Sequence, residues 1–584
     1  MTRPPATVFD RSVALERLGG EEFDVLIVGG GITGAGVALE ASAGGLRTAL
    51  VERSDFAAGT SSKSSKLVHG GLRYLQQREL RLVHESLLER QRLLTNAPHL
   101  VQPLTFLIPL FGKGGVVDKT LVRAFSAALW GYDLAGGWRI GKRHRKIKAA
   151  EIQAHLPTLR SERVVAGFLY YDASTDDARL TLSVLRTAVL EHGAAAANYA
   201  AVTGFRRGAD GRITGAALAD GTEIRAGVVV NATGIWADEL RALDPTDGAP
   251  YLRPAKGTHL VVSRSKLPCD TAAVIPVPGD RRSIFVVPWG DHTYLGTTDT
   301  DYEGPLDDPP VTRADVDYIL GAVNTWVSPQ LRAADVTATW AGLRPLLAST
   351  PGRPHQLSER TADLSRRHRV VVSADGLVTI TGGKLTTYRK MAEDTLAVVT
   401  ASLGERPRPS PTRRLPLRGA VGAAAFRGRR AAAELGVEPA VLDHLRRRYG
   451  GETAAVIGLT AGDPGLVAPL VPGLPYLRAE AVYAVRYEMA FTLEDVLARR
   501  TRALFLEAEA TAGAARDVAA LMGPHLGWDA DRMAGEVAHV EGLARASLAA
   551  ARSSPGAATD DDLAGDVVAA RTSAGEAAAE EMRP

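Results

Sequence analysis

Residues 23–52 (FDVLIVGGGITGAGVALEASAGGLRTALVE) hold the pattern that most constrains the fold of this chain. An apolar run at 24–28 comes before three glycines in the spacing G-x-G-x-x-G, and residues 32–43 then repeat apolar side chains with helical period. A second apolar run at 48–51 ends at an acidic residue. The pattern predicts a strand, a helix and a second strand within about 30 residues.

The glycines and the acidic residue together predict a dinucleotide site. Gly29 permits a tight turn, Gly31 lets a pyrophosphate approach the backbone, and Gly34 lets the helix lie close to the strand. The helix N-terminus adds free N–H groups and positive potential. Glu52 would accept hydrogen bonds from a ribose and repel a 2′-phosphate, so the stretch favours FAD or NAD over NADP. A glycine-rich loop without a ligand is the alternative.

Residues 53–75 (RSDFAAGTSSKSSKLVHGGLRYL) follow directly on this unit and are rich in small, hydroxylic and basic side chains. Because residues 55–65 cannot build a core, we expect their hydroxyl and N–H groups to line the cofactor. A solvated loop is the alternative. His69 and Arg73 then place a titratable base and a fixed cation close to the site.

Two later strands are also expected to end at the cofactor. An apolar strand at 227–231 runs into NATGIWAD, where small residues let the backbone approach a ligand. Another at 377–381 is followed by two glycines, Lys384 and a polar helix start, which repeats the arrangement of the first turn. Between them, short strands over 256–301 predict an antiparallel sheet and hence a second domain.

Bulk properties limit the remaining choices. The 584 residues exceed one ordinary core, so two or three domains are expected. Sixty-nine basic and 66 acidic residues give a net charge of +3, which provides no general attraction to nucleic acid. The single cysteine, Cys269, excludes an intrachain disulfide and a cysteine-based metal cluster. We expect no metal site and a reducing compartment.

The sequence predicts neither a signal peptide nor a transmembrane helix. Residues 1–20 carry five charged side chains and no apolar core segment. No window approaches about 20 uninterrupted apolar residues. We therefore expect a cytoplasmic protein that, where it meets a membrane, lies on the surface of that membrane.

Residues 120–134 form the segment best suited to such a surface. They read as an amphipathic helix that leads into a basic cluster at 142–148. An apolar stripe beside basic side chains is typical of a helix on anionic lipid. A core-packed helix followed by a solvated basic loop is an equal alternative. The stripe consists of Leu121, Val122, Phe125, Leu129 and Trp130.

The C-terminal part of the chain is predicted to be helical. A linker, PRPSPTRR, begins at Pro407, and helical periods dominate from there to about residue 549. The tail from Arg552 has almost no large apolar side chain, which predicts disorder.

Eight motifs together resemble the FAD-dependent glycerol-3-phosphate dehydrogenases, in the order of that family and over roughly residues 20–510. They are VGGGITGAG at 28–36, GTSSKSSKLVHGGLRYL at 59–75, NATGIWAD at 231–238, KGTHLVV at 256–262, GTTDTDY at 296–302, AGLRPL at 341–346, GGKLTTYRKMAED at 382–394 and YEMAFTLEDVLARRTRALF at 487–505.

The resemblance implies an α/β fold. A Rossmann-type FAD-binding domain is interleaved with an antiparallel-sheet substrate domain, as in D-amino-acid oxidase and glutathione reductase, and a C-terminal all-α domain follows. The expected ranges are 21–75, 173–247 and 350–402 for the FAD-binding domain, 76–172 and 248–349 for the substrate domain, and 407–549 for the C-terminal domain, with tails at 1–20 and 550–584.

The resemblance also implies an activity. The family oxidises sn-glycerol 3-phosphate to dihydroxyacetone phosphate with FAD and passes electrons to a membrane quinone, which implies a peripheral position on the inner face of the cell membrane. The related oxidases use oxygen and make hydrogen peroxide, and look to carry a long insertion after AGLRPL. The short connection between Arg344 and Leu377 favours the dehydrogenase. An amino-acid-type flavin oxidase and a non-catalytic flavoprotein are further alternatives, and a homodimer is left open.

Candidate catalytic residues follow from the reaction. An alcohol oxidation needs a base, for which His69 is the first choice and His259 the second. It also needs cations for the phosphate: Arg344 with its planar fork, then Lys384 and Arg73. A structural histidine is the alternative for either imidazole. The residues expected to bind the cofactor are Gly29, Gly31, Gly34, Glu52, Thr60, Ser61, Ser62, Ser65, Lys66, Gly70, Gly71, Ala232, Gly234, Gly383, Lys384, Leu385 and Thr386.

Overall fold

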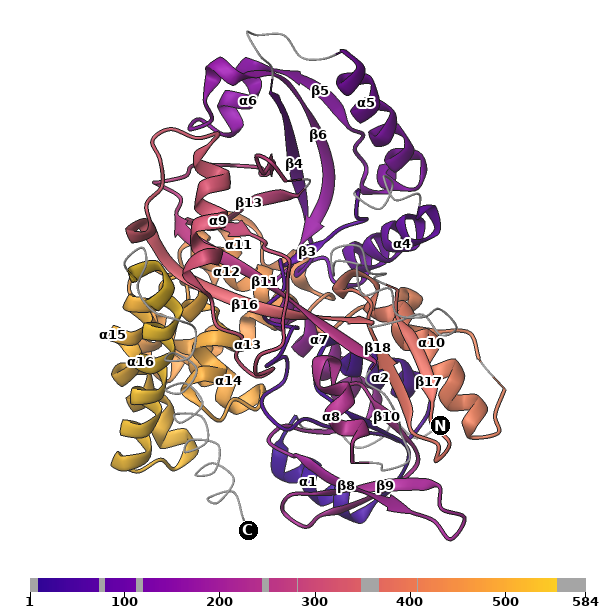
Figure 1. Ribbon diagram of the computed structural model, residues 1–584. Helices are drawn as coiled ribbons and strands as arrows, with labels where there is room; N and C mark the ends of the chain where they lie inside the picture. The colour runs from indigo at the N-terminus through magenta and orange to yellow at the C-terminus, as the bar shows by residue number, and fades with distance from the viewer. Residues whose placement is uncertain are drawn as a thin grey trace.

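The computed structural model describes residues 9–72, 79–111, 119–243, 251–280, 282–347, 367–406 and 408–553. Two sheets and a helical C-terminal region make up this part of the chain (Figure 1). The arrangement confirms the predicted fold class. Arg73, the linker residue Pro407 and the tail from residue 554 lie outside the described residues, and the domain boundaries stay a prediction.

The first sheet is built around the predicted glycine unit. Its parallel strands lie in the order β18-β10-β1-β2-β7, and β17 pairs antiparallel with β18 at one edge. A hairpin, β8 and β9, extends β10. The strands are β1 (Glu22–Val28), β2 (Thr48–Val51), β7 (Ala195–Ala197), β8 (Val202–Arg207), β9 (Ile213–Leu218), β10 (Glu223–Asn231), β17 (Arg369–Val372) and β18 (Val378–Thr381).

Both faces of this sheet are covered, which explains the continuous apolar runs of its strands. Val25 and Ile27 of β1 face a core shared with helices α2 (Ile32–Ala43), α7 (Asp177–His192) and α10 (Tyr388–Ser402). Phe23 and Val28 face a second core with α1 (Arg11–Gly20). Helix α7 is capped by Asp176, which accepts a hydrogen bond from the Arg179 N–H.

The second sheet is mostly antiparallel, as predicted. Its strands lie in the order β15-β11-β14-β13-β12-β4-β6-β3, with β16 beside β11 and β5 beside β6; the pair β12 and β4 is parallel. The strands are β3 (Leu67–Val68), β4 (Gln102–Phe111), β5 (Arg145–Lys148), β6 (Val164–Ser174), β11 (Leu252–Ser263), β12 (Ala272–Pro276), β13 (Ser283–Trp289), β14 (His292–Gly296), β15 (Thr300–Asp301) and β16 (Val336–Leu347).

Helices flank the sheets and form the C-terminal region. In Figure 1, α15 and α16 lie side by side below β16, and α5 lies at the periphery beyond β6. The remaining helices are α4 (Leu80–Asn96), α5 (Lys119–Leu134), α6 (Ala149–His155), α8 (Ala237–Arg241), α9 (Arg313–Asn324), α11 (Gly428–Glu434), α12 (Pro439–Tyr449), α13 (Thr453–Gly458), α14 (Arg478–Tyr487), α15 (Ala508–Leu526) and α16 (Ala530–Arg552).

The predicted apolar stripe of α5 divides between the core and the surface. Leu129 is buried, and Val122 and Phe125 pack partly buried against the core of the second sheet. Trp130, which the sequence placed on the same side, is instead 49% exposed. The helix therefore packs on the protein through most of the stripe, as the core-packed alternative required. Within the described residues, no helix has the length and apolar character needed to cross a bilayer.

Steric closeness explains why glycines occupy the β1–α2 turn. Gly29 has φ +114°, and a Cβ there would lie 2.7 Å from the carbonyl oxygen of Ala232 in the loop after β10. A Cβ on Gly34 would overlap the carbonyl oxygen of Gly29. Helix α2 and strand β10 therefore approach the end of β1 at a distance that only glycine allows.

Gly34→Ala should lower the thermal unfolding temperature and the flavin content of the purified protein, because the overlap with the Gly29 carbonyl forces α2 away from β1. Overpacking of this kind costs about 1–3 kcal/mol or more. The matched control is Gly321→Ala in α9, where a Cβ meets no atom within 4 Å. That change should raise stability by about 0.5–1 kcal/mol through helix propensity. Equal effects of both substitutions would contradict the steric argument.

Candidate active site

The carboxyl ends of four parallel strands meet at one edge of the first sheet. Val28 of β1 pairs with Val51 of β2 and with Asn231 of β10, so Gly29, Glu52 and Ala232 follow at one level. The β18 end lies beside β10 through the pair of Asn231 and Thr379. Ligands of open α/β sheets bind at this edge. The four predicted cofactor segments therefore converge, although the sequence separates them widely.

The β1–α2 turn offers backbone donors to an anion. Gly31 is the N-cap of α2, with no side-chain capping bond and no acidic residue in the first turn. The Ile32 N–H, at the start of the helix, donates to Ser61 Oγ at 2.9 Å. A bare glycine turn at a helix N-terminus fits the pyrophosphate of a dinucleotide.

The Glu52 carboxylate forms hydrogen bonds with two backbone N–H groups of the protein. It accepts hydrogen bonds from Gly30 N–H at 2.7 Å and Ser54 N–H at 2.9 Å. Burial among protein atoms raises the pKa of Glu52, while these two bonds oppose the rise. A carboxylate has about four acceptor positions, so Glu52 can accept further hydrogen bonds besides these two.

The loop at 59–66 is held by the protein around it. Thr60 Oγ1 donates to Leu343 O at 2.7 Å, and Ser62 Oγ donates to Gly59 O at 3.3 Å. The buried Lys66 ammonium donates to Ser62 O and to Asp177. The cofactor roles of Thr60, Ser62 and Lys66 stay predictions, since the side-chain contacts described above are with protein.

His69 to Gly71 lies between the first sheet and the second. Thr386, before α10, accepts a hydrogen bond from the His69 N–H at 3.2 Å and donates to the His69 carbonyl at 3.4 Å. The Gly70 N–H contacts Tyr132 Oη at 3.0 Å and Asp172 Oδ1 at 3.2 Å. A Cβ at Gly70 would lie 2.5 Å from Tyr132 Oη. Tyr132 and Asp172 thus fix this turn, and no sequence signal pointed to either.

His259 is a buried, neutral imidazole. Its Nε2 lies 2.9 Å from Ser65 Oγ, and its ring stacks on Trp340 with centroids 4.7 Å apart. Burial, together with the nearby cations of Lys66 and Arg344, holds the pKa of His259 well below its ordinary value. Its buried Nδ1 has no hydrogen-bond partner within the part of the chain that the structure describes.

Arg344 lies on the same strand and face of the second sheet as Trp340. Its guanidinium donates to Asp299 Oδ1 at 3.1 Å and Thr298 O at 3.1 Å, with longer contacts to Thr297 Oγ1 and Lys256 O. The side chain keeps 19% of its surface exposed. A Cβ at Gly257 would come within 2.9 Å of the guanidinium carbon, so glycine makes room for the fork. Arg344 is therefore oriented before any ligand arrives.

Lys384 follows β18 at the start of the helical turn 385–387. Its Nζ contacts Ser86 Oγ of α4 at 3.4 Å. Behind it, Arg389 of α10 pairs with the buried Glu89 of α4, with both hydrogen bonds at 2.7 Å. Gly382 and Gly383 before it have positive φ angles of +76° and +84°. The α4–α10 contact therefore fixes the β18 end of the site.

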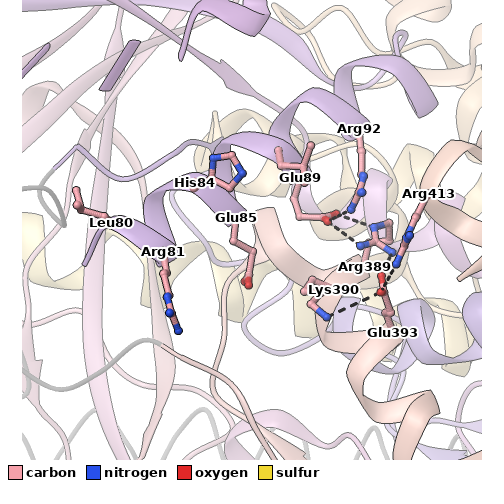
Figure 2. Close-up of a pocket in the computed structure, with 11 residues that line it drawn as sticks. Leu80, Arg81, His84, Glu85, Glu89, Arg92, Arg389, Lys390, Glu393 and Arg413 are labelled. Carbon is pink, nitrogen blue, oxygen red and sulfur yellow. Dashed lines mark hydrogen bonds and ion pairs between the residues drawn. The ribbon is translucent and has the colours of Figure 1, made fainter. Parts of the chain in front are cut away.

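Figure 2 shows an open groove between α4 and α10, about 580 Å³ in volume. Arg389 and Arg413 both pair there with Glu393, and Arg92 pairs with Glu89. Of the predicted catalytic residues that the structure describes, none lines the groove. We therefore do not assign it to the substrate.

Comparisons with known proteins agree with this geometry. A family model described as "FAD dependent oxidoreductase" matches residues 24–389, and one described as "C-terminal domain of alpha-glycerophosphate oxidase" matches residues 410–533. "Glycerol-3-phosphate dehydrogenase 2" of Mycobacterium tuberculosis is 41% identical over 98% of this chain and 95% of its own. The mitochondrial glycerol-3-phosphate dehydrogenase of Homo sapiens is 37% identical over 87% and 71%.

Solved structures place the fold in the same group. The X-ray structure of the glycerol-3-phosphate dehydrogenase from Bacillus halodurans complexed with FAD is 31% identical, covers 94% of this chain and 99% of its own, and has a TM-score of 0.74. An FAD-bound L-alpha-glycerophosphate oxidase from Mycoplasma pneumoniae shares the fold at 18% identity, with a TM-score of 0.53 and coverage of 68% and 98%. From the identity over nearly the whole chain, the glycine turn and the converging strand ends, we conclude that this protein belongs to the FAD-dependent glycerol-3-phosphate dehydrogenases, a family of flavoprotein oxidoreductases.

Proposed function

We propose that the protein oxidises sn-glycerol 3-phosphate to dihydroxyacetone phosphate and passes the electrons to a membrane quinone. Arg344 is the main support for this substrate, because its guanidinium is pre-oriented and partly exposed on the sheet face next to the converging strand ends. FAD, when bound, accepts the hydride from the substrate carbon. The protein supplies the phosphate site, the base and the exclusion of water.

Arg344 is the first phosphate ligand in this proposal. Its planar fork suits two phosphate oxygens, but the ion pair with Asp299 reduces the positive charge that a phosphate would meet. A second cation is therefore needed, and Lys384, held by α4 at Ser86, is our choice. Arg73 is the proposed third cation and lies outside the described residues.

His69 is the proposed base. Its backbone is fixed on one side by Thr386 and on the other by the contacts of Gly70 with Tyr132 and Asp172. A general base works best when its pKa is near the operating pH, and the pKa of His259 lies well below that range. His259 therefore remains the second choice, and its hydrogen bond to Ser65 favours a role in holding the loop.

An oxidase that uses oxygen is the second candidate, because the C-terminal family model carries the name of an alpha-glycerophosphate oxidase. The short connection between Arg344 and Leu377 favours the dehydrogenase. Anaerobic reduction of the flavin by glycerol 3-phosphate, followed by reoxidation with either a quinone or oxygen, separates the two. A panel with amino-acid substrates tests the amino-acid-type oxidase, and a flavin that no substrate reduces would indicate a non-catalytic flavoprotein.

We also propose a peripheral position on the inner face of the cell membrane. The end of α5 and the turn after it expose Trp130, Leu134 at 78% and Trp138 at 54%. The exposed basic side chains of Lys142, Arg143, Arg145 and Lys146 follow in the chain. Aromatic and apolar side chains beside cations suit the interface of an anionic bilayer. The proposed contact differs from the predicted stripe, because most of that stripe packs on the protein.

Arg344→Ala should lower kcat/KM for glycerol 3-phosphate by tens- to hundreds-fold, because a charge-assisted contact of about 2–4 kcal/mol to the phosphate is lost. Steady-state kinetics with a quinone acceptor measures the change. Arg253→Ala is the matched control, since it removes another Arg–Asp pair, with Asp301, on neighbouring strands of the same sheet. An unchanged kcat/KM in the Arg344 variant would remove Arg344 from the phosphate site.

His69→Asn should reduce the rate of anaerobic flavin reduction about 100- to 10000-fold while a product analogue still binds, because the amide cannot accept the alcohol proton. The wild-type rate should rise with pH through the imidazole range, and this rise should vanish in the variant. A variant that keeps both the wild-type rate and the rise with pH would exclude His69 as the base and make His259→Asn the next substitution.

A double change, Trp130→Ser with Leu134→Ser, should weaken binding to anionic phosphatidylglycerol vesicles tenfold or more, because burying each side chain is worth about 1.5–3 kcal/mol. Co-sedimentation measures the binding. Val421→Ser is the control, since Val421 is 79% exposed but belongs to the C-terminal region. Equal binding of the double variant and the wild type would place the membrane contact elsewhere.

A further inference from the structure

A segment of the C-terminal region reaches into the loop that lines the cofactor edge. Thr501 and Arg502 join the π-helical turn Asp495–Arg500 to the short turn Ala503–Phe505, and Arg502 has a φ of +83°. A non-glycine residue in this left-handed region is uncommon and costs free energy. The Arg502 side chain is completely buried. The backbone conformation and the burial of the charge both cost free energy, so an arginine at this position indicates that its guanidinium makes a specific contact.

That contact is the backbone of the loop 59–66. Arg502 donates one hydrogen bond to Ser62 O and another, at 2.9 Å, to Ala498 O of its own segment. The guanidinium also lies 3.4 Å from Asp177 Oδ1 at the start of α7. Lys66 Nζ donates to the same Ser62 carbonyl at 3.0 Å and to Asp177 at 3.1 Å. Two cations from different parts of the chain therefore share one carbonyl and one carboxylate.

Asp177 ties the middle of the loop to this pair. Its Oδ2 accepts hydrogen bonds from the Ser64 N–H at 3.0 Å and the Ser64 hydroxyl at 2.7 Å. Lys66, directly after Ser65, has a φ of +56°, so it adopts the same uncommon left-handed backbone conformation as Arg502. Without Arg502, one carbonyl and one carboxylate of this cluster would each lose a donor in a buried site.

The residue between these anchors faces the second sheet. Ser65 Oγ lies 2.9 Å from His259 Nε2, and Tyr294 donates to Ser65 O at 2.8 Å. Lys66 Nζ lies 4.8 Å from the centroid of Trp340, the ring on which His259 stacks. At the other end of the loop, Ser61 accepts the first free N–H of α2. The loop thus joins the cofactor turn to His259, and Arg502 holds its centre.

We propose that Arg502 is a positioning residue for the flavin site: from the C-terminal region it fixes the loop 59–66, and through that loop it sets the α2 N-terminal turn and His259. The C-terminal helices thereby become part of the active-site architecture rather than an appended module. The proposal rests on the FAD-binding family membership for its flavin measurement, and on the proposed substrate only for its kinetic measurement.

The test compares holoenzyme variants Arg502→Met and Arg186→Met. Arg186 is a matched control: it is buried, and it also joins α7 to the C-terminal region, through Glu452 at 2.6 and 3.0 Å and Tyr483 at 3.2 Å. Within the part of the chain that the structure describes, Arg186 forms no hydrogen bond or ion pair with the loop 59–66. Both variants should unfold at a lower temperature, since each removes a charged donor from buried acceptors.

Only Arg502→Met should release its FAD faster, by tenfold or more after dilution, as followed by the rise in flavin fluorescence. Its anaerobic flavin reduction by glycerol 3-phosphate should also slow by tenfold or more, with kcat affected more than KM. A variant that loses thermal stability like Arg186→Met, yet holds FAD and reduces it at the wild-type rate, would overturn the proposal. If glycerol 3-phosphate does not reduce the wild-type flavin, the FAD release rate still decides.

Arg502→Lys covers the case in which Arg502→Met does not fold. A single ammonium cannot reach Ser62 O, Ala498 O and Asp177 with the fork geometry of a guanidinium. Circular dichroism should show a folded protein, with FAD release about threefold or more faster than in the wild type. A folded Arg502→Lys protein with wild-type FAD release would overturn the proposal.

Discussion

The close approach of three backbone segments at the end of β1 is the constraint on which the rest of the structure depends. The Gly29 carbonyl lies against Gly34 in the first turn of α2, and the Ala232 carbonyl lies against Gly29. Neither glycine therefore has room for a side chain. This crowding brings the N-terminus of α2 and the end of β10 to one point. A cofactor phosphate can then meet backbone N–H groups directly, without intervening side chains.

Buried charge joins the C-terminal region to this point. Asp55, three residues after Glu52, accepts hydrogen bonds from Arg499 and Arg500, and all three side chains are buried. Burial would raise the pKa of Asp55, but the two arginines outweigh it and hold the pKa below its ordinary value. Removing one partner of such a pair costs about 3–5 kcal/mol, because the other charge stays buried. These ion pairs therefore stabilise the contact between the C-terminal region and the residues after β2. Acidification that protonates Asp55 removes this contribution to stability.

A second buried carboxylate, Asp172, holds the turn after His69. Asp172 of β6 accepts hydrogen bonds from Arg90, Tyr132 and the Gly70 N–H. Tyr132 belongs to α5, whose end carries the exposed Trp130 and Leu134. The proposed membrane contact and the turn after His69 are thus parts of one packed unit.

The sequence by itself determined the local elements: the β1–α2 turn, the short strands over 256–301 and the helical C-terminal region. Their signals are periodicity and turn residues, which act within a few positions of the chain. The family resemblance supplied the cofactor and the candidate site residues beyond what those patterns indicate. Only the tertiary structure decided the partners of buried charges, such as Arg502 with Ser62, 440 positions apart, and Asp172 with Gly70, 102 apart. It also decided that Trp130 faces out while Leu129 faces in. Such contacts depend on strand register and on how whole elements pack, and no local pattern in the chain records either.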